Sequence, residues 1–97
     1  MATNNTNLSS YNKEDVPNAK DFSFGIVVSE WNSNITKNLY KGAFDALVEC
    51  GVNKKDITKY VVPGSYELVF GAKIASKKNP DAIICLGSVI QGETKHF

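Results

Sequence analysis

The sequence predicts a three-layer α/β/α fold with a parallel sheet and a βαβαβ order of elements. Short apolar runs rich in β-branched residues alternate with segments whose apolar residues recur at helical spacing. Glycine, proline and asparagine separate these segments. Strands that alternate with helices favour a parallel sheet with right-handed crossovers. We expect residues 22–97 to form this single domain and residues 1–21 to form a polar, flexible N-terminal segment.

The first strand is expected over residues 22–29, where three consecutive apolar residues suit a sheet covered on both faces. Residues 30–34 form a polar break in which Asn32, Ser33 or Asn34 could cap a helix. Residues 35–50 show helical spacing, and Gly51 follows where a left-handed cap belongs. The stripe expected to face the sheet is Ile35, Leu39, Ala43, Ala46, Leu47 and Cys50.

The second half of the chain repeats this pattern. A strand is expected over residues 56–62, and Pro63-Gly64-Ser65 ends it. A helix is expected over residues 66–77 and ends before Asn79-Pro80. A third strand is expected over residues 81–87. The residues of the second helix expected to point inward are Leu68, Ala72 and Ala75.

Composition excludes several classes of function. The net charge is +1, and the eleven basic residues, all lysines, form no basic stripe, so we expect no nucleic-acid partner. No apolar run reaches membrane-spanning length, and the first residues resemble neither a secretory signal nor a transit peptide, so the cytoplasm is expected. Cys50 and Cys85 lie in apolar stretches and are expected to be small buried hydrophobes. With one histidine, no metal site is expected.

The predicted topology brings the unusual residues together. All strands of a parallel sheet end at the same edge, where open α/β sheets bind ligands. The segments that follow the three strands, residues 29–34, 62–67 and 87–96, must therefore lie near one another. They contain a tryptophan among polar residues, Pro-Gly-Ser-Tyr-Glu and Gly-Glu-Thr-Lys-His. The sequence therefore predicts a ligand site at this edge.

Each candidate side chain also has a plainer interpretation. Trp31 could stack on a ring-shaped ligand, or it could cover the core edge or a subunit interface. Glu67 could accept a ligand hydroxyl, or it could stabilise a helix N-terminus. The turn around Glu93 and Thr94 could hold a phosphate or be a polar turn. His96 could transfer protons near neutral pH or be incidental.

Three motifs in unbroken order resemble those of the lumazine synthases. Residues 26–32, Ile-Val-Val-Ser-Glu-Trp-Asn, are similar to the opening of that family. Residues 62–68, Val-Pro-Gly-Ser-Tyr-Glu-Leu, resemble its Val-Pro-Gly-(Ala/Ser)-aromatic-Glu motif. Residues 87–97, Gly-Ser-Val-Ile-Gln-Gly-Glu-Thr-Lys-His-Phe, resemble its active-site loop. The resemblance covers about residues 24–97 and implies a flavodoxin-like fold.

The resemblance implies a transferase of riboflavin biosynthesis that needs no cofactor. The family condenses 5-amino-6-(D-ribitylamino)uracil with 3,4-dihydroxy-2-butanone 4-phosphate to give 6,7-dimethyl-8-ribityllumazine. It implies that Trp31 stacks on the pyrimidine ring and that His96 transfers protons. Two further segments would bind the first substrate: Ser65, Tyr66 and Glu67 at the ribityl chain, and Ser88, Val89 and Ile90 at the uracil edge. Glu93 and Thr94 would hold the phosphate of the second.

The sequence also departs from the family's pattern. The family's chain continues past the histidine with a further strand and two helices, an arginine for the phosphate and an aromatic given to the next subunit. Without these parts, we expect the 97-residue chain alone to be inactive. The family further implies a homopentamer or a pentamer-based icosahedral shell, with riboflavin synthase as a possible partner. The alternatives are a non-catalytic module for a flavin or phosphoryl ligand and a shell-forming structural protein.

Overall fold

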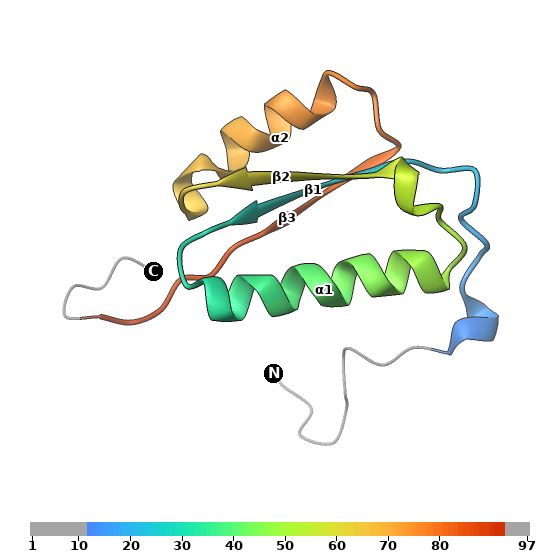
Figure 1. The fold of residues 1–97 in the computed structure, drawn as a ribbon, viewed down its shortest axis with the longest axis horizontal. Coiled ribbons are helices and arrows are strands. Elements are labelled where there is room, and N and C mark those ends of the chain that lie inside the picture. The colour runs from blue at the N-terminus through green and yellow to red at the C-terminus, as the bar shows by residue number, and fades with distance from the viewer. Residues whose placement is uncertain (1–11, 93–97) are drawn as a thin grey trace.

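Three parallel strands lie between two helices in the computed structural model, which describes residues 12–92 (Figure 1). The strands β1 (Phe24–Ser29), β2 (Ile57–Val62) and β3 (Ala82–Leu86) form one sheet in the order β2-β1-β3. Helix α1 (Ser33–Glu49) covers one face and α2 (Leu68–Ser76) covers the other. The predicted α/β/α architecture and its βαβαβ order are confirmed.

The register places the ends of the strands together. Phe24 of β1 lies opposite Ile57 of β2 and Ala82 of β3. Both neighbours run parallel to β1, so all three strands finish at the same edge. Two hydrogen bonds join the residues that precede β1 and β3. The backbone N–H of Ser23 donates to Asp81 Oδ2 at 2.8 Å, and the N–H of Asp81 donates to the Ser23 carbonyl at 2.9 Å.

Alternate residues of β1 supply the two halves of the core. Ile26 is fully buried beneath α1 with Val52 and Ile57, and the aromatic rings of Tyr40 and Phe44 pack against them. On the other face, Val27, Val62 and Ala75 are buried beneath α2. The continuous apolar run in β1 is thus explained by a sheet that is covered on both sides.

The predicted inward stripe of α1 is wrong at its N-terminal end. Ile35 and Leu39 are 42% and 41% exposed. The side of the helix that packs on the sheet carries Tyr40, Phe44 and Leu47. Apolar residues cover a wide arc of α1, and the orientation that buries the two large rings removes the most apolar surface from water.

The C-terminal end of α1 agrees with the prediction. Gly51 has φ 103°, and its N–H donates to the Val48 carbonyl at 3.0 Å. The N–H of Val52 donates to the Leu47 carbonyl, also at 3.0 Å. This pair of bonds is a Schellman motif, which satisfies carbonyls left open at the end of the helix.

The second helix starts later than predicted. Residues Ser65–Glu67 form a 3₁₀ turn, and α2 proper begins at Leu68. Ala75 is buried, and Leu68 and Ala72 are half-buried, so their predicted inward direction is confirmed. The buried residue that the pattern missed is Gly71, which lets the helix approach the sheet closely.

The expectation of two buried cysteines is wrong for Cys85. Both cysteines are free, Cys50 is half-buried and Cys85 is exposed. Cys85 shares a sheet face with Ile83, two residues earlier, on the side of α2. Because β3 is an edge strand and α2 packs on Val27 and Val62, Cys85 is left uncovered.

Candidate functional site

Backbone hydrogen bonds join the segments that follow β1 and β2. The N–H of Glu30 donates to the Val62 carbonyl at 2.8 Å, and the N–H of Trp31 donates to the Pro63 carbonyl at 3.0 Å. These bonds continue the pairing of the two strands past their ends. They fix the backbone of the tryptophan beside the Pro-Gly-Ser turn.

A hydrogen bond also joins the segment after β3 to the Pro63-Gly64-Ser65 turn. The Ser65 hydroxyl donates to the Ser88 carbonyl over 3.3 Å. Gly87 allows this approach, because a Cβ at that position would lie 2.7 Å from Ser65 Oγ and 2.8 Å from Leu68 Cδ1. The predicted convergence of the three segments at one sheet edge is therefore observed.

Trp31 does not cover the core formed by residues 12–92. Its side chain is 61% exposed, although the strand before it is buried. The next residue, Asn32, has left-handed backbone angles, φ 58° and ψ 52°. Its carbonyl accepts the first bonds of α1, from the N–H groups of Ile35 and Thr36 at 2.9 and 3.0 Å. A tight turn thus projects a large planar ring into solvent at the sheet edge.

Glu67 has an observed structural role. Its Oε1 accepts a hydrogen bond from the Gly64 N–H at 2.8 Å, which holds the turn closed. A carboxylate has a second oxygen that can accept from a ligand, so the two interpretations of Glu67 are compatible. The neighbouring Tyr66 is 91% exposed, and its ring carries no part of the described core.

The third segment is only partly described. Ser88 is half-buried, and the side chains of Val89 and Ile90 are exposed along the loop that leaves β3. Glu93, Thr94 and His96 lie outside the described residues. The roles expected of these three residues therefore remain predictions.

Two polar side chains at this edge were not predicted as site residues. Ser29, the last residue of β1, is 1% exposed, and its Oγ has no hydrogen-bond partner within residues 12–92. The Nδ2 of Asn32 is also buried and has no partner in that range. A hydroxyl that ends an apolar strand is a visible signal in the sequence. The burial of the amide depends on the left-handed turn, which the sequence does not show.

Neither a metal-ligand cluster nor a membrane-spanning helix is present within residues 12–92. That range contains no group of three or more histidine, cysteine, aspartate or glutamate residues placed to hold a metal ion. None of the helices described there combines the length and hydropathy that a membrane crossing needs.

The fold and this edge define a class of protein. Open parallel α/β sheets bind ligands outside the carboxyl ends of their strands, and here that edge presents an aromatic ring, hydroxyl groups and a glycine turn. The chain is a parallel α/β domain whose exposed edge has the groups that such domains use to bind ligands.

Comparison with known proteins narrows this class. The family model described as 6,7-dimethyl-8-ribityllumazine synthase matches residues 21–97. Proteins named 6,7-dimethyl-8-ribityllumazine synthase from Flavobacterium johnsoniae, Christiangramia forsetii and Porphyromonas gingivalis are 60%, 58% and 48% identical to the chain. Each match covers 100% of this chain but 52%, 59% and 61% of the relative. The chain belongs to the 6,7-dimethyl-8-ribityllumazine synthase family, and it spans little more than half the length of these relatives.

Proposed function

We propose that the protein containing this chain condenses 5-amino-6-(D-ribitylamino)uracil with 3,4-dihydroxy-2-butanone 4-phosphate to give 6,7-dimethyl-8-ribityllumazine and phosphate. The observation that carries the proposal is the joining of the three motif-bearing segments at the carboxyl edge of the sheet. Membership of the family supports the choice of reaction. The chain would supply one wall of the site.

The first substrate would lie across this edge. Its pyrimidine ring would stack on the exposed ring of Trp31. The backbone N–H of Trp31 donates to the Pro63 carbonyl, which fixes the main chain from which the ring projects. Its uracil edge would meet Ser88, Val89 and Ile90. The Ser65–Ser88 hydrogen bond supports this arrangement, because it holds the third segment beside the second.

The ribityl chain would lie over Ser65, Tyr66 and Glu67. Glu67 already accepts the Gly64 N–H through Oε1, and its other oxygen would accept a ribityl hydroxyl. The exposed ring of Tyr66 would cover part of the chain. A carboxylate fixed by its own turn loses little freedom when it binds the ligand.

The chemistry needs orientation and proton transfer. The amine of the first substrate attacks the ketone of the second, and loss of water gives an imine. Phosphate then leaves, and ring closure follows. Glu93 and Thr94 would hold the phosphate, and His96 would move protons near neutral pH. Holding two reactants in position supplies much of the rate enhancement in such a condensation, and no metal or organic cofactor is required.

The proposal includes self-assembly into a homopentamer or a pentamer-based shell, in the cytoplasm. Large apolar side chains are exposed on both helices, and contiguous exposed apolar surface is typical of interfaces. Ile35 and Leu39 lie on α1, whereas Val69 and Phe70 of α2 are 80% and 65% exposed. Riboflavin synthase would be a partner of such an assembly.

The tryptophan makes substrate binding directly measurable. Trp31 is the only tryptophan of the chain, so its fluorescence should fall as 5-amino-6-(D-ribitylamino)uracil stacks on it. In calorimetry, Trp31→Ala should weaken binding about tenfold through loss of stacking. Phe22→Ala is the matched control, because Phe22 is also an exposed aromatic but precedes β1 at the opposite edge. Unchanged fluorescence at saturating substrate, or equal losses in both variants, would contradict the proposed site.

Substitution of the histidine separates the enzyme from a binding module. In the full-length protein, His96→Ala should lower the rate of lumazine formation by about 10²–10⁴ while substrate affinity is largely kept. Lumazine fluorescence measures the rate. A protein that binds the substrate but forms no lumazine even with His96 intact would support the binding module or the shell protein instead.

A further inference from the structure

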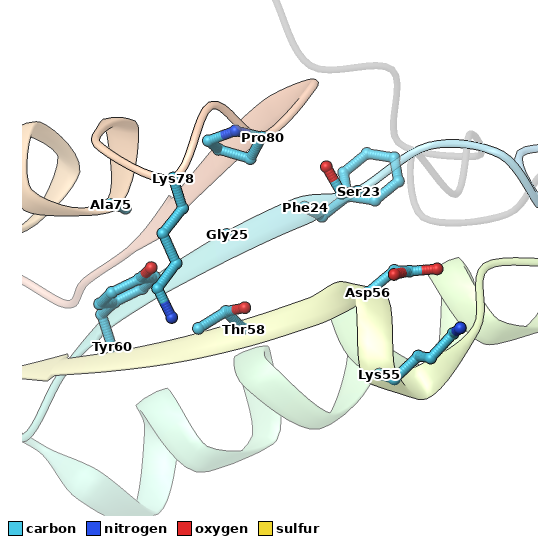
Figure 2. A pocket seen from close by; sticks show the side chains of 10 residues that line it. All are labelled: Ser23, Phe24, Gly25, Lys55, Asp56, Thr58, Tyr60, Ala75, Lys78 and Pro80. Carbon is cyan, nitrogen blue, oxygen red and sulfur yellow. The ribbon is translucent and has the colours of Figure 1, made fainter.

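A cavity lies at the sheet edge opposite the candidate active site. It has a volume of about 170 Å³ and lies between the first residues of β1 and β2 and the end of α2 (Figure 2). Its floor is Gly25, where the missing side chain leaves space between the Tyr60 ring and Ala75. The three segments of the candidate active site contribute no residue to it. The reaction proposed above does not use this cavity.

One end of the cavity is lined by a lysine and two hydroxyl-bearing residues. Figure 2 shows the side chain of Lys78 running from the end of α2 towards Thr58 and Tyr60. Within residues 12–92 the one ion pair is Lys41–Asp45, so no carboxylate in that range neutralises the Lys78 ammonium. An ammonium group and two hydroxyls that line the same end of a cavity can together bind an anion, since all three groups donate hydrogen bonds.

The charged residues at the other end of the cavity limit how much negative charge a ligand can carry. Asp56 lines the cavity there, away from Lys78 (Figure 2). Lys55 lines the cavity at the same end as Asp56, so these two opposite charges offset each other and Lys78 leaves the lining with a net charge of one. A single negative charge balances it, whereas a phosphate dianion would keep an excess charge near the Asp56 carboxylate. The wall made by Ala75, Pro80 and the Tyr60 ring is apolar and suits a short hydrocarbon body.

We propose that this cavity binds a small monocarboxylate, with its carboxylate on Lys78, Thr58 and Tyr60 and its hydrocarbon part against Ala75 and Pro80. The volume would hold about six water molecules at about 30 Å³ each, which is enough for a ligand of four to six carbon atoms. We expect about millimolar affinity for so small a ligand, which corresponds to about 0.7 kcal/mol per non-hydrogen atom of butyrate.

Butyrate, titrated into the full chain, is the probe. Backbone amide signals of Gly25 and Thr58 should shift saturably in heteronuclear NMR spectra. Lys78→Ala should weaken binding about tenfold or more, because it removes a charge-assisted hydrogen bond. Lys77→Ala is the matched control: it removes the same charge one residue earlier at the same helix end, outside the cavity lining. Binding in this control should stay within about twofold.

Two more probes separate the ligand classes. Inorganic phosphate should bind more weakly than butyrate because of its second charge, and n-butanol should bind more weakly because it has none. Tyr60→Phe keeps the packed ring and should weaken butyrate binding about threefold through loss of its hydroxyl. It serves as the test if Lys78→Ala perturbs the helix end.

Each outcome of these titrations either supports or overturns the proposed monocarboxylate site. Saturable shifts that depend on Lys78 and Tyr60 but not on Lys77 support the site. The absence of saturable shifts, equal losses in the Lys77 and Lys78 variants, or equal binding of butanol would overturn it. A preference for phosphate would overturn the monocarboxylate assignment. None of these results bears on Trp31, so the test fails or succeeds separately from the proposed condensation.

Discussion

The close approach of α2 to the sheet depends on Gly71, and Gly71→Ala should therefore destabilise the fold. A Cβ at this position would lie 2.6 Å from Val27 Cγ1 and 2.9 Å from Val62 Cγ1. Carbon atoms pack at about 3.5–4.0 Å, so the helix or the valines must move by roughly 1 Å. Val27 is fully buried in the central strand and cannot turn away into solvent.

The magnitude follows from two opposing effects. Overpacking a tight core costs about 1–3 kcal/mol, and replacing glycine by alanine inside a helix returns up to about 1 kcal/mol. We expect a net loss of about 1–2 kcal/mol. Gly42→Ala in α1 is the matched control, because a Cβ there meets nothing within 4 Å. The control should gain up to about 1 kcal/mol from helix propensity alone.

Urea denaturation followed by far-UV circular dichroism measures both variants. The denaturation midpoint should fall for Gly71→Ala and rise for Gly42→Ala, with unchanged dependence on urea concentration. A total difference of about 2–3 kcal/mol between them is expected. If both midpoints move in the same direction by similar amounts, then α2 does not depend on close contact with Val27, and the packing argument fails.

Two further predictions concern the candidate active site. Gly87→Ala places a Cβ 2.7 Å from Ser65 Oγ, so it should separate the second and third segments. Substrate binding should weaken about tenfold in calorimetry. The fold should lose little stability, because the atoms that the new Cβ crowds are the ends of side chains. Unchanged affinity would show that the two segments need not touch. Asn32 has φ 58°, a left-handed backbone angle that glycine adopts more easily than alanine. In thermal or urea unfolding, the Asn32→Gly variant should therefore be more stable than Asn32→Ala by about 1 kcal/mol. Equal stabilities would contradict a left-handed turn at this position.

The order of the strands and helices could be predicted from the sequence because each element depends on a local pattern of residues. Ile26, Val27 and Val28 form a β-branched run that suits a covered strand, and Gly51 takes the positive φ that few other residues tolerate. The alternation of strands with helices then implies parallel pairing, which brings Trp31 and Ser65 to one edge. Family motifs could indicate the chemistry for the same reason, since they lie in the segments that topology brings together.

Other features depended on packing that no local pattern encodes. The arc of α1 that faces the sheet was decided by the burial of Tyr40 and Phe44, which left Ile35 and Leu39 exposed. The exposure of Cys85 follows from the edge position of β3, although its apolar neighbours suggested a buried residue. The buried amide of Asn32 follows from its left-handed backbone.

The sequence by itself determined the parallel α/β/α class, the edge at which the motifs converge and the family to which those motifs belong. Such features follow from hydrophobic periodicity and from the single edge at which parallel strands end. Only the tertiary structure decided that Ser65 bonds to Ser88, that Glu67 closes its own turn and that a cavity opens over Gly25. These features depend on distances between residues far apart in the chain, and such distances are set by how the helices pack on the sheet.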